Sequence, residues 1–188
     1  MANGDGVVAA RASSPAVEEP SAVVVRRARS GERDAFGELY RRYAGMVHGI
    51  LLARLPRSEV ADAAQEVFLR ALRHLASLRD DRAFGGWLAT LARTVATDWY
   101  RRPQRRFELG PLPDDLADGR GTDADALGLL SAIRSLPPAY AETLLMRLVE
   151  GMSGPEIAER TGLTPESVRV NLCRGMKRLR SALGGGTR

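Results

Sequence analysis

Apolar residues recur every three or four positions between residues 58 and 78, which is the spacing of one face of an amphipathic helix. Ser58 begins this predicted helix, and a charged loop over residues 79–83 follows it. The apolar face consists of Val60, Ala63, Ala64, Val67, Phe68, Ala71, Leu72, Leu75 and Leu78. We assign this face to a protein core, which leaves the polar face for solvent or a partner.

Similar spacing predicts further helices on both sides. One covers residues 31–54, with Ser30 as its cap, and Pro56 breaks the pattern. Another covers residues 84–102, and helices resume at residue 127. The inward positions are Phe36, Leu39, Tyr40, Tyr43, Val47, Ile50 and Leu51 on the first, and Trp87, Leu88, Leu91, Val95 and Trp99 on the second. No segment alternates with the period of a strand, so the sequence predicts an all-α fold.

Two segments without helical periodicity divide the chain. Residues 1–25 are rich in small residues and indicate a disordered tail, whereas residues 107–125 combine glycine and proline with five aspartates and indicate a flexible acidic linker. We therefore expect a first small helical domain over residues 26–106 and a second over residues 126–183. Residues 184–188 form a short tail.

Residues 154–180 have the pattern of a helix-turn-helix. Ala158 is small where the second helix must cross, and Gly162 supplies the positive φ of a tight turn. Thr164 is a suitable N-cap and Pro165 a suitable first helical residue. The buried stripe of the second helix is Val168, Leu172, Met176 and Leu179. The opposite face is basic and rich in hydrogen-bonding groups, which suits insertion into a DNA major groove.

Composition and charge support a polyanionic partner. The chain has 188 residues and a net charge of +5, and both predicted domains are positive while the linker is negative. Basic domains most often bind nucleic acid, although an arginine excess in a chain rich in Ala and Gly also reflects genome composition. Cys173 is the single cysteine, which excludes an internal disulfide. No long apolar run is present, so we expect a cytoplasmic protein without direct membrane insertion.

The candidate chemistry does not favour an enzyme. His48 and His74 are the only histidines, and they are not spaced as metal ligands together with Cys173. No glycine-rich phosphate loop is present, because the three glycines at 184–186 belong to the tail. We therefore expect no catalytic residues, no metal and no cofactor.

Four blocks of sequence, in order, resemble an extracytoplasmic-function (ECF) sigma factor, the small two-domain class of specificity subunit of bacterial RNA polymerase. They are Asp34–Tyr43, Ala61–Leu72, Phe84–Arg102 and Leu136–Arg180. The resemblance implies promoter recognition, with core RNA polymerase (its clamp and flap regions), promoter DNA and an anti-sigma factor as partners.

The resemblance also implies roles for individual residues. It assigns polymerase binding to Asp62, Gln65, Glu66, Arg70 and Arg73. It assigns the −10 element to Leu78, Arg79, Asp80, Arg82, Leu91, Arg93, Thr94, Tyr100, Arg101, Arg102, Arg105 and Arg106. It assigns the −35 element to Glu166, Ser167, Arg169, Val170, Asn171, Arg174, Lys177 and Arg178.

The chain departs from the usual pattern of that family at several of these positions. Leu78 stands where an aromatic residue is frequent and Thr94 where asparagine is frequent. Val170 and Asn171 replace the usual Ser-Arg pair, and Cys173 replaces histidine. Asparagine can pair with adenine and valine can contact a thymine methyl group, so the expected promoter preference differs from the common one.

One alternative remains open from the sequence. A stand-alone helix-turn-helix regulator with an N-terminal helical sensing or dimerisation domain explains the C-terminal half equally well. Such a regulator binds duplex DNA alone, usually as a dimer on two half-sites. It does not account for the polar face around Gln65 and Glu66 or for the acidic linker.

Overall fold

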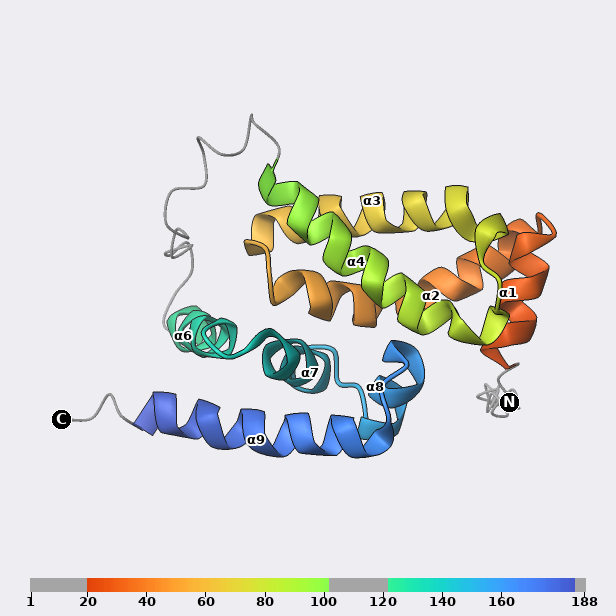
Figure 1. The fold of residues 1–188 in the computed structure, drawn as a ribbon. Helices are drawn as coiled ribbons and strands as arrows, with labels where there is room; N and C mark the ends of the chain where they lie inside the picture. The colour runs from red at the N-terminus through yellow and green to blue at the C-terminus, as the bar shows by residue number, and fades with distance from the viewer. Residues whose placement is uncertain (1–19, 102–121, 185–188) are drawn as a thin grey trace, which may run out of the picture.

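The computed structural model describes residues 20–101 and 122–184, and every regular element in these two ranges is helical. Figure 1 shows two groups of helices lying against each other. The N-terminal unit contains α1 (Ser21–Arg29), α2 (Arg33–Leu52), α3 (Arg57–His74) and α4 (Phe84–Arg101), with single 3-10 turns at Leu75–Ser77 and Asp81–Ala83. The C-terminal unit contains α6 (Thr122–Arg134), α7 (Pro138–Leu148), α8 (Gly154–Thr161) and α9 (Pro165–Gly184).

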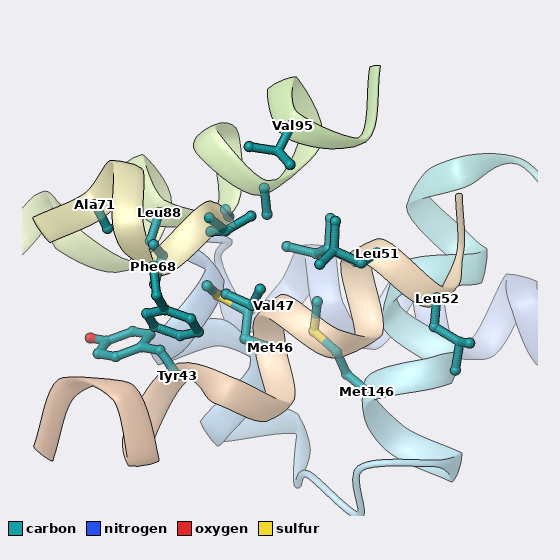
Figure 2. Packing of buried hydrophobic residues seen from close by; sticks show 14 of the residues in the cluster. Tyr43, Met46, Val47, Leu51, Leu52, Phe68, Ala71, Leu88, Val95 and Met146 are labelled. Carbon is teal, nitrogen blue, oxygen red and sulfur yellow. The ribbon is translucent and has the colours of Figure 1, made fainter. Parts of the chain in front are cut away.

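Helix α2 is the centre of the N-terminal unit, with α1, α3 and α4 packed around it. Its inward face buries Leu39, Val47 and Leu51 completely. Tyr43 meets Phe84 of α4 edge to face, with ring centroids 5.0 Å apart. Figure 2 shows the side chains of Val47 and Leu51 in this layer, between the helices of the unit. Aromatic and aliphatic side chains at helical spacing thus build the core that the sequence predicted.

The first helix begins earlier than the sequence indicated. Ser21 opens α1 within the segment that we assigned to an irregular tail, and Val24 and Val25 are fully buried. A single helix of nine residues is too short to show a clear period within a longer polar segment. Ser30 does not cap the following helix as expected, because its hydroxyl donates to the carbonyl of Arg27 at 2.8 Å and ends α1.

Two residues that the pattern placed in the core lie largely at the surface. Tyr40 is 49% exposed and Leu72 is 52% exposed. Both occupy the edge of their apolar stripe, beyond the area that the neighbouring helices cover. Leu78 and Trp99 are buried, as the pattern predicted.

The two units share one continuous hydrophobic core. Helix α7 lies against α2, and α8 lies against α4. Met146 of α7 points toward α2 close to Leu51 and Leu52 (Figure 2). Glycines allow this close approach: a Cβ atom on Gly49 would lie 2.9 Å from Cγ of Met146, and a Cβ atom on Gly85 only 2.3 Å from the carbonyl oxygen of Arg160. The spacing of apolar residues did not predict this docking.

Candidate nucleic-acid interface

Local hydrogen bonds fix the helix-turn-helix in the conformation that the sequence predicted. Gly162 ends α8 with φ of 73°, and the hydroxyl of Thr164 accepts a hydrogen bond from the amide of Ser167 at 3.1 Å. Ser153 and Glu156 add a capping box at the start of α8, because each side chain accepts from the backbone amide of the other. The Ser153 amide also lowers the pKa of Glu156 below its ordinary value.

Helix α9 is anchored by one face and presents the other to solvent. Val168 and Leu179 are buried, and Leu172 and Met176 are half-buried against the core. Of the residues expected at the −35 element, Ser167, Val170 and Asn171 are half-buried. The exposed ones are Glu166, Arg169, Arg174, Lys177 and Arg178. These side chains therefore share one accessible surface, with Cys173 also exposed on the same helix.

Two of these residues have intramolecular partners. Arg169 donates to Glu166 at 2.7 Å, and this hydrogen bond lowers the pKa of the Glu166 carboxyl. The guanidinium group of Arg178 lies 5.7 Å from the centre of the Tyr140 ring, within the range of a cation–π contact. Both pairs lie at the surface, where such contacts are weak and exchange readily with phosphates or bases.

The residues expected at the −10 element differ in their exposure. Arg79, Asp80, Arg82, Thr94 and Arg101 are exposed, whereas Leu91 is half-buried and Leu78 is buried. The Asp80 carboxylate accepts from the amide of Arg82 at 2.9 Å and so orders the loop before α4. Tyr100 lies in the last turn of α4, and Arg102, Arg105 and Arg106 lie outside the described residues.

Arg93 differs from the other residues in this set. Its guanidinium group faces the C-terminal unit, where it donates to Glu142 of α7 at 2.8 Å. Glu142 is buried and also accepts from Arg54, at 2.6 Å. The family resemblance assigned Arg93 to DNA. In the structure, a carboxylate of the C-terminal unit binds its guanidinium group.

The residues expected to bind polymerase lie together on the outer face of α3. Asp62, Gln65 and Arg73 are exposed, and Glu66 and Arg70 are half-buried. Arg70 donates to Asp98 of α4 at 2.9 Å and to Glu66 at 2.8 Å, and these bonds raise the pKa of its guanidinium group. Arg70 thus helps to join α3 to α4, in addition to any external contact.

An apolar groove of about 370 Å³ adjoins this face and was not anticipated from the sequence. Its lining is Phe36, Tyr40, Ala61, Gln65, Phe68, Leu69 and Leu72. Tyr40, Leu69 and Leu72 are each at least 40% exposed. The apolar spacing placed Tyr40 and Leu72 in the core. Spacing alone does not show whether another helix covers the edge of an apolar face, so the groove was not predicted. Exposed apolar groups gathered in a groove commonly mark a protein interface.

Within the described residues, no group of His, Cys, Asp and Glu side chains is arranged to hold a metal ion. In the same ranges, no helix is long and apolar enough to cross a membrane.

Comparison with known proteins shows the family to which this chain belongs. Residues 39–106 match the family model for sigma-70 region 2, and residues 126–179 match that for sigma-70 region 4. The ECF RNA polymerase sigma factor BldN of Streptomyces coelicolor is 31% identical over 204 residues, which cover 95% of this chain and 77% of the relative. The chain belongs to the ECF sigma factor family. It is therefore an RNA polymerase sigma factor, and the stand-alone regulator is not favoured.

Other similarities agree with this membership. The RNA polymerase sigma factor CarQ of Myxococcus xanthus is 31% identical over 167 residues, which cover 85% of this chain and 95% of CarQ. The solved structure of CnrH in complex with the cytosolic domain of CnrY has the same fold, with a TM-score of 0.61 and 23% identity over 90% of this chain and 100% of that one. The region 2 match begins inside α2 and includes α3 and α4, and the region 4 match includes α7, α8 and most of α9.

Proposed function

We propose that this sigma factor binds core RNA polymerase through the outer face of α3 and the adjoining groove. Asp62, Gln65 and Arg73 offer exposed polar groups, and Leu69 and Leu72 offer exposed apolar area beside them. An apolar centre with a polar rim is the usual composition of a stable protein interface. Glu66 and Arg70 complete the polar rim while they pair with each other.

In the same proposal, the loop before α4 and the exposed side of α4 bind the −10 element. Arg79 and Arg82 provide charge for phosphates, and Thr94 provides a hydroxyl near the half-buried Leu91. Capture of an unstacked base needs such a combination of an apolar wall and hydrogen-bonding groups. Arg101, at the end of α4, extends the positive charge along this side. Tyr100, Arg102, Arg105 and Arg106 belong to the same assignment by sequence alone.

Helix α9 reads the −35 element in the major groove. Glu166, Ser167, Arg169, Val170 and Asn171 occupy its N-terminal half and are assigned to base edges. Arg174, Lys177 and Arg178 are exposed in its C-terminal half and are assigned to phosphates. The observation that carries this assignment is the fixed turn at Gly162 and Thr164, which positions α9 with its polar face outward.

We also infer that the protein acts without catalysis, in the cytoplasm, and is regulated by an anti-sigma factor. The sigma factor RpoE of Bartonella quintana has been solved in complex with the anti-sigma factor NepR, and CnrH with the cytosolic domain of CnrY. A comparable partner here would compete with polymerase for the groove or for the interface between the two units.

Reconstituted run-off transcription tests the proposed function. Purified protein is added to bacterial core RNA polymerase with a pool of promoter fragments from the source genome, and transcript starts are sequenced. We expect starts that require both components and share one −35/−10 pair. Absence of stimulation, together with tight binding to a palindromic duplex without polymerase, would overturn the proposal.

A further inference from the structure

A buried carboxylate joins the two DNA-binding units. Glu142 of α7 is only 5% exposed. Its Oε1 accepts from Nη2 of Arg54 at 2.6 Å and from Nε at 3.1 Å. Its Oε2 accepts from Nη2 of Arg93 at 2.8 Å and from Nε at 3.2 Å. Both arginines belong to the N-terminal unit, so the charge of Glu142 is neutralised across the interface.

This geometry is that of a small anion between two guanidinium groups. Arginine binds carboxylate and phosphate oxygens in the same forked manner. A phosphate group that took the place of the Glu142 carboxylate would find the same donors. Arg93 also lies on α4, one residue before Thr94, in the helix that we assign to the −10 element. The pair of Arg54 and Arg93 thus presents to a phosphate group the same donors that hold the Glu142 carboxylate.

Further contacts around Glu142 hold the two units together. Gly49 and Gly85 lack the side chains that would hold the units apart, as described above. Arg134 of α6 donates to the carbonyl of Leu52 at 2.8 Å and to that of Leu55. His48 of α2 contacts Glu150, which follows α7. Glu142 thus lies within a complementary surface and is not an isolated surface ion pair.

We propose that Glu142 is an intramolecular competitor of DNA: it occupies a phosphate site formed by Arg54 and Arg93, and the two units must separate before DNA can bind there. That the displacing DNA is a promoter rests on the proposed function, whereas the competition itself does not. The closed arrangement is then a DNA-excluded state of the free protein, and opening it removes Glu142 from both arginines.

Binding of a fluorescein-labelled single-stranded dT20 to the full chain, without polymerase, tests the competition. Glu142→Gln keeps the shape of the side chain but removes its charge. We expect about tenfold tighter binding at low salt for this variant than for the unmodified chain. The slope of log K against log salt should steepen by about 0.7, because one further phosphate is contacted and each phosphate of a single strand contributes roughly 0.7.

A matched pair of glycine variants tests the same opening without touching any charge. Gly85→Ala places a methyl group 2.3 Å from the Arg160 carbonyl oxygen, whereas the same methyl group at Gly86 lies 3.6 Å from the nearest atom, the Thr161 carbonyl oxygen. We expect Gly85→Ala to increase the radius of gyration in small-angle X-ray scattering and to bind dT20 more tightly. Gly86→Ala should match the unmodified chain in both measurements.

The double variant Glu142→Gln with Arg93→Gln decides whether the released arginine causes the gain. We expect the double variant to lose most of the gain in dT20 affinity that Glu142→Gln produces. Retention of the full gain would overturn the proposal, and so would a folded Glu142→Gln variant with unchanged affinity and salt slope. A chain that fails in run-off transcription but shows the expected dT20 results would refute the sigma-factor roles while the competition stands.

Discussion

Trp99 donates its indole N–H to the carboxylate of Glu59 at 2.9 Å and so joins the end of α4 to the first turn of α3. The ring itself is almost fully buried. Trp99→Phe should lower the free energy of unfolding by about 1–3 kcal/mol, because it removes a hydrogen bond and leaves a cavity. Urea unfolding followed by circular dichroism measures this change. Trp87→Phe, at a half-buried position of the same helix, is the control and should cost less; equal losses would contradict the role of the bond.

Gly162 connects the two helices of the DNA-binding motif with φ of 73°. Gly162→Ala should destabilise the fold by about 1–2 kcal/mol, because an L side chain is strained in this region. Gly154→Ala provides a control, since no atom lies within 4 Å of a Cβ there and φ is ordinary. Urea midpoints of the two variants should therefore separate, and coincident midpoints would show that the turn relaxes.

Leu72 tests the proposed polymerase surface. Leu72→Asp should weaken binding to core polymerase by at least about tenfold, because a charge is introduced into an apolar contact that must be desolvated. The fold should be retained, since Leu72 is 52% exposed. Leu183→Asp makes the same change at a leucine that is 50% exposed on α9. Fluorescence anisotropy against labelled core polymerase should separate the two; similar affinities would place the polymerase contact elsewhere.

Asn171 and Lys177 test the division of α9 into base-reading and phosphate-binding halves. Asn171→Ala should reduce binding to the preferred −35 sequence by about 1–3 kcal/mol and relax selectivity at one base pair. Lys177→Ala should weaken all sequences equally and make the salt slope shallower by about 0.9. Selection of bound sequences from a randomised −35 pool distinguishes these outcomes, and a changed consensus for the Lys177 variant would reverse the assignment.

The capping box at the start of α8 makes a pH-dependent contribution. The Ser153 amide lowers the pKa of Glu156 from 4.5, so the carboxylate favours the folded state. A depressed pKa gives stabilisation that is present above the unfolded value and is lost as the pH falls through the folded value. The stability difference between the unmodified chain and Glu156→Gln should thus be constant from about pH 7 to 5 and shrink below 4.5. A difference independent of pH down to 3 would exclude this contribution.

The predictions that the structure confirms are those that depend on neighbouring residues in the sequence. Gly162, Thr164 and Pro165 predicted the turn and the start of α9, because capping and positive φ depend only on neighbouring residues. The all-helical class followed from periodicity in the same way. Prediction was weaker where burial depends on distant helices, as Tyr40 and Leu72 show.

The docking of the two units lay beyond the reach of pattern analysis. Glu142 has the sequence context of an ordinary surface residue, yet it is buried between arginines 88 and 49 positions away. Gly49 lies inside the helical pattern of α2 and Gly85 in the first turn of α4, and the reason for both glycines appears only when α7 and α8 are in place. A glycine inside a helix costs roughly 0.5–1 kcal/mol relative to alanine, and this local cost was the one available signal of the contact.

The two sides of the interface between the units belong to one chain, and this affects how strongly the units associate with each other. Covalent connection gives each unit an effective concentration near the other on the order of millimolar. An interface that would be too weak to hold two separate proteins together can therefore keep the units associated most of the time. By the same arithmetic, a partner that binds one of the facing surfaces with micromolar affinity can displace the other unit at ordinary concentrations. Covalent connection thus lets the two units stay together without the affinity that two separate proteins would need, and still lets a partner for one facing surface open them.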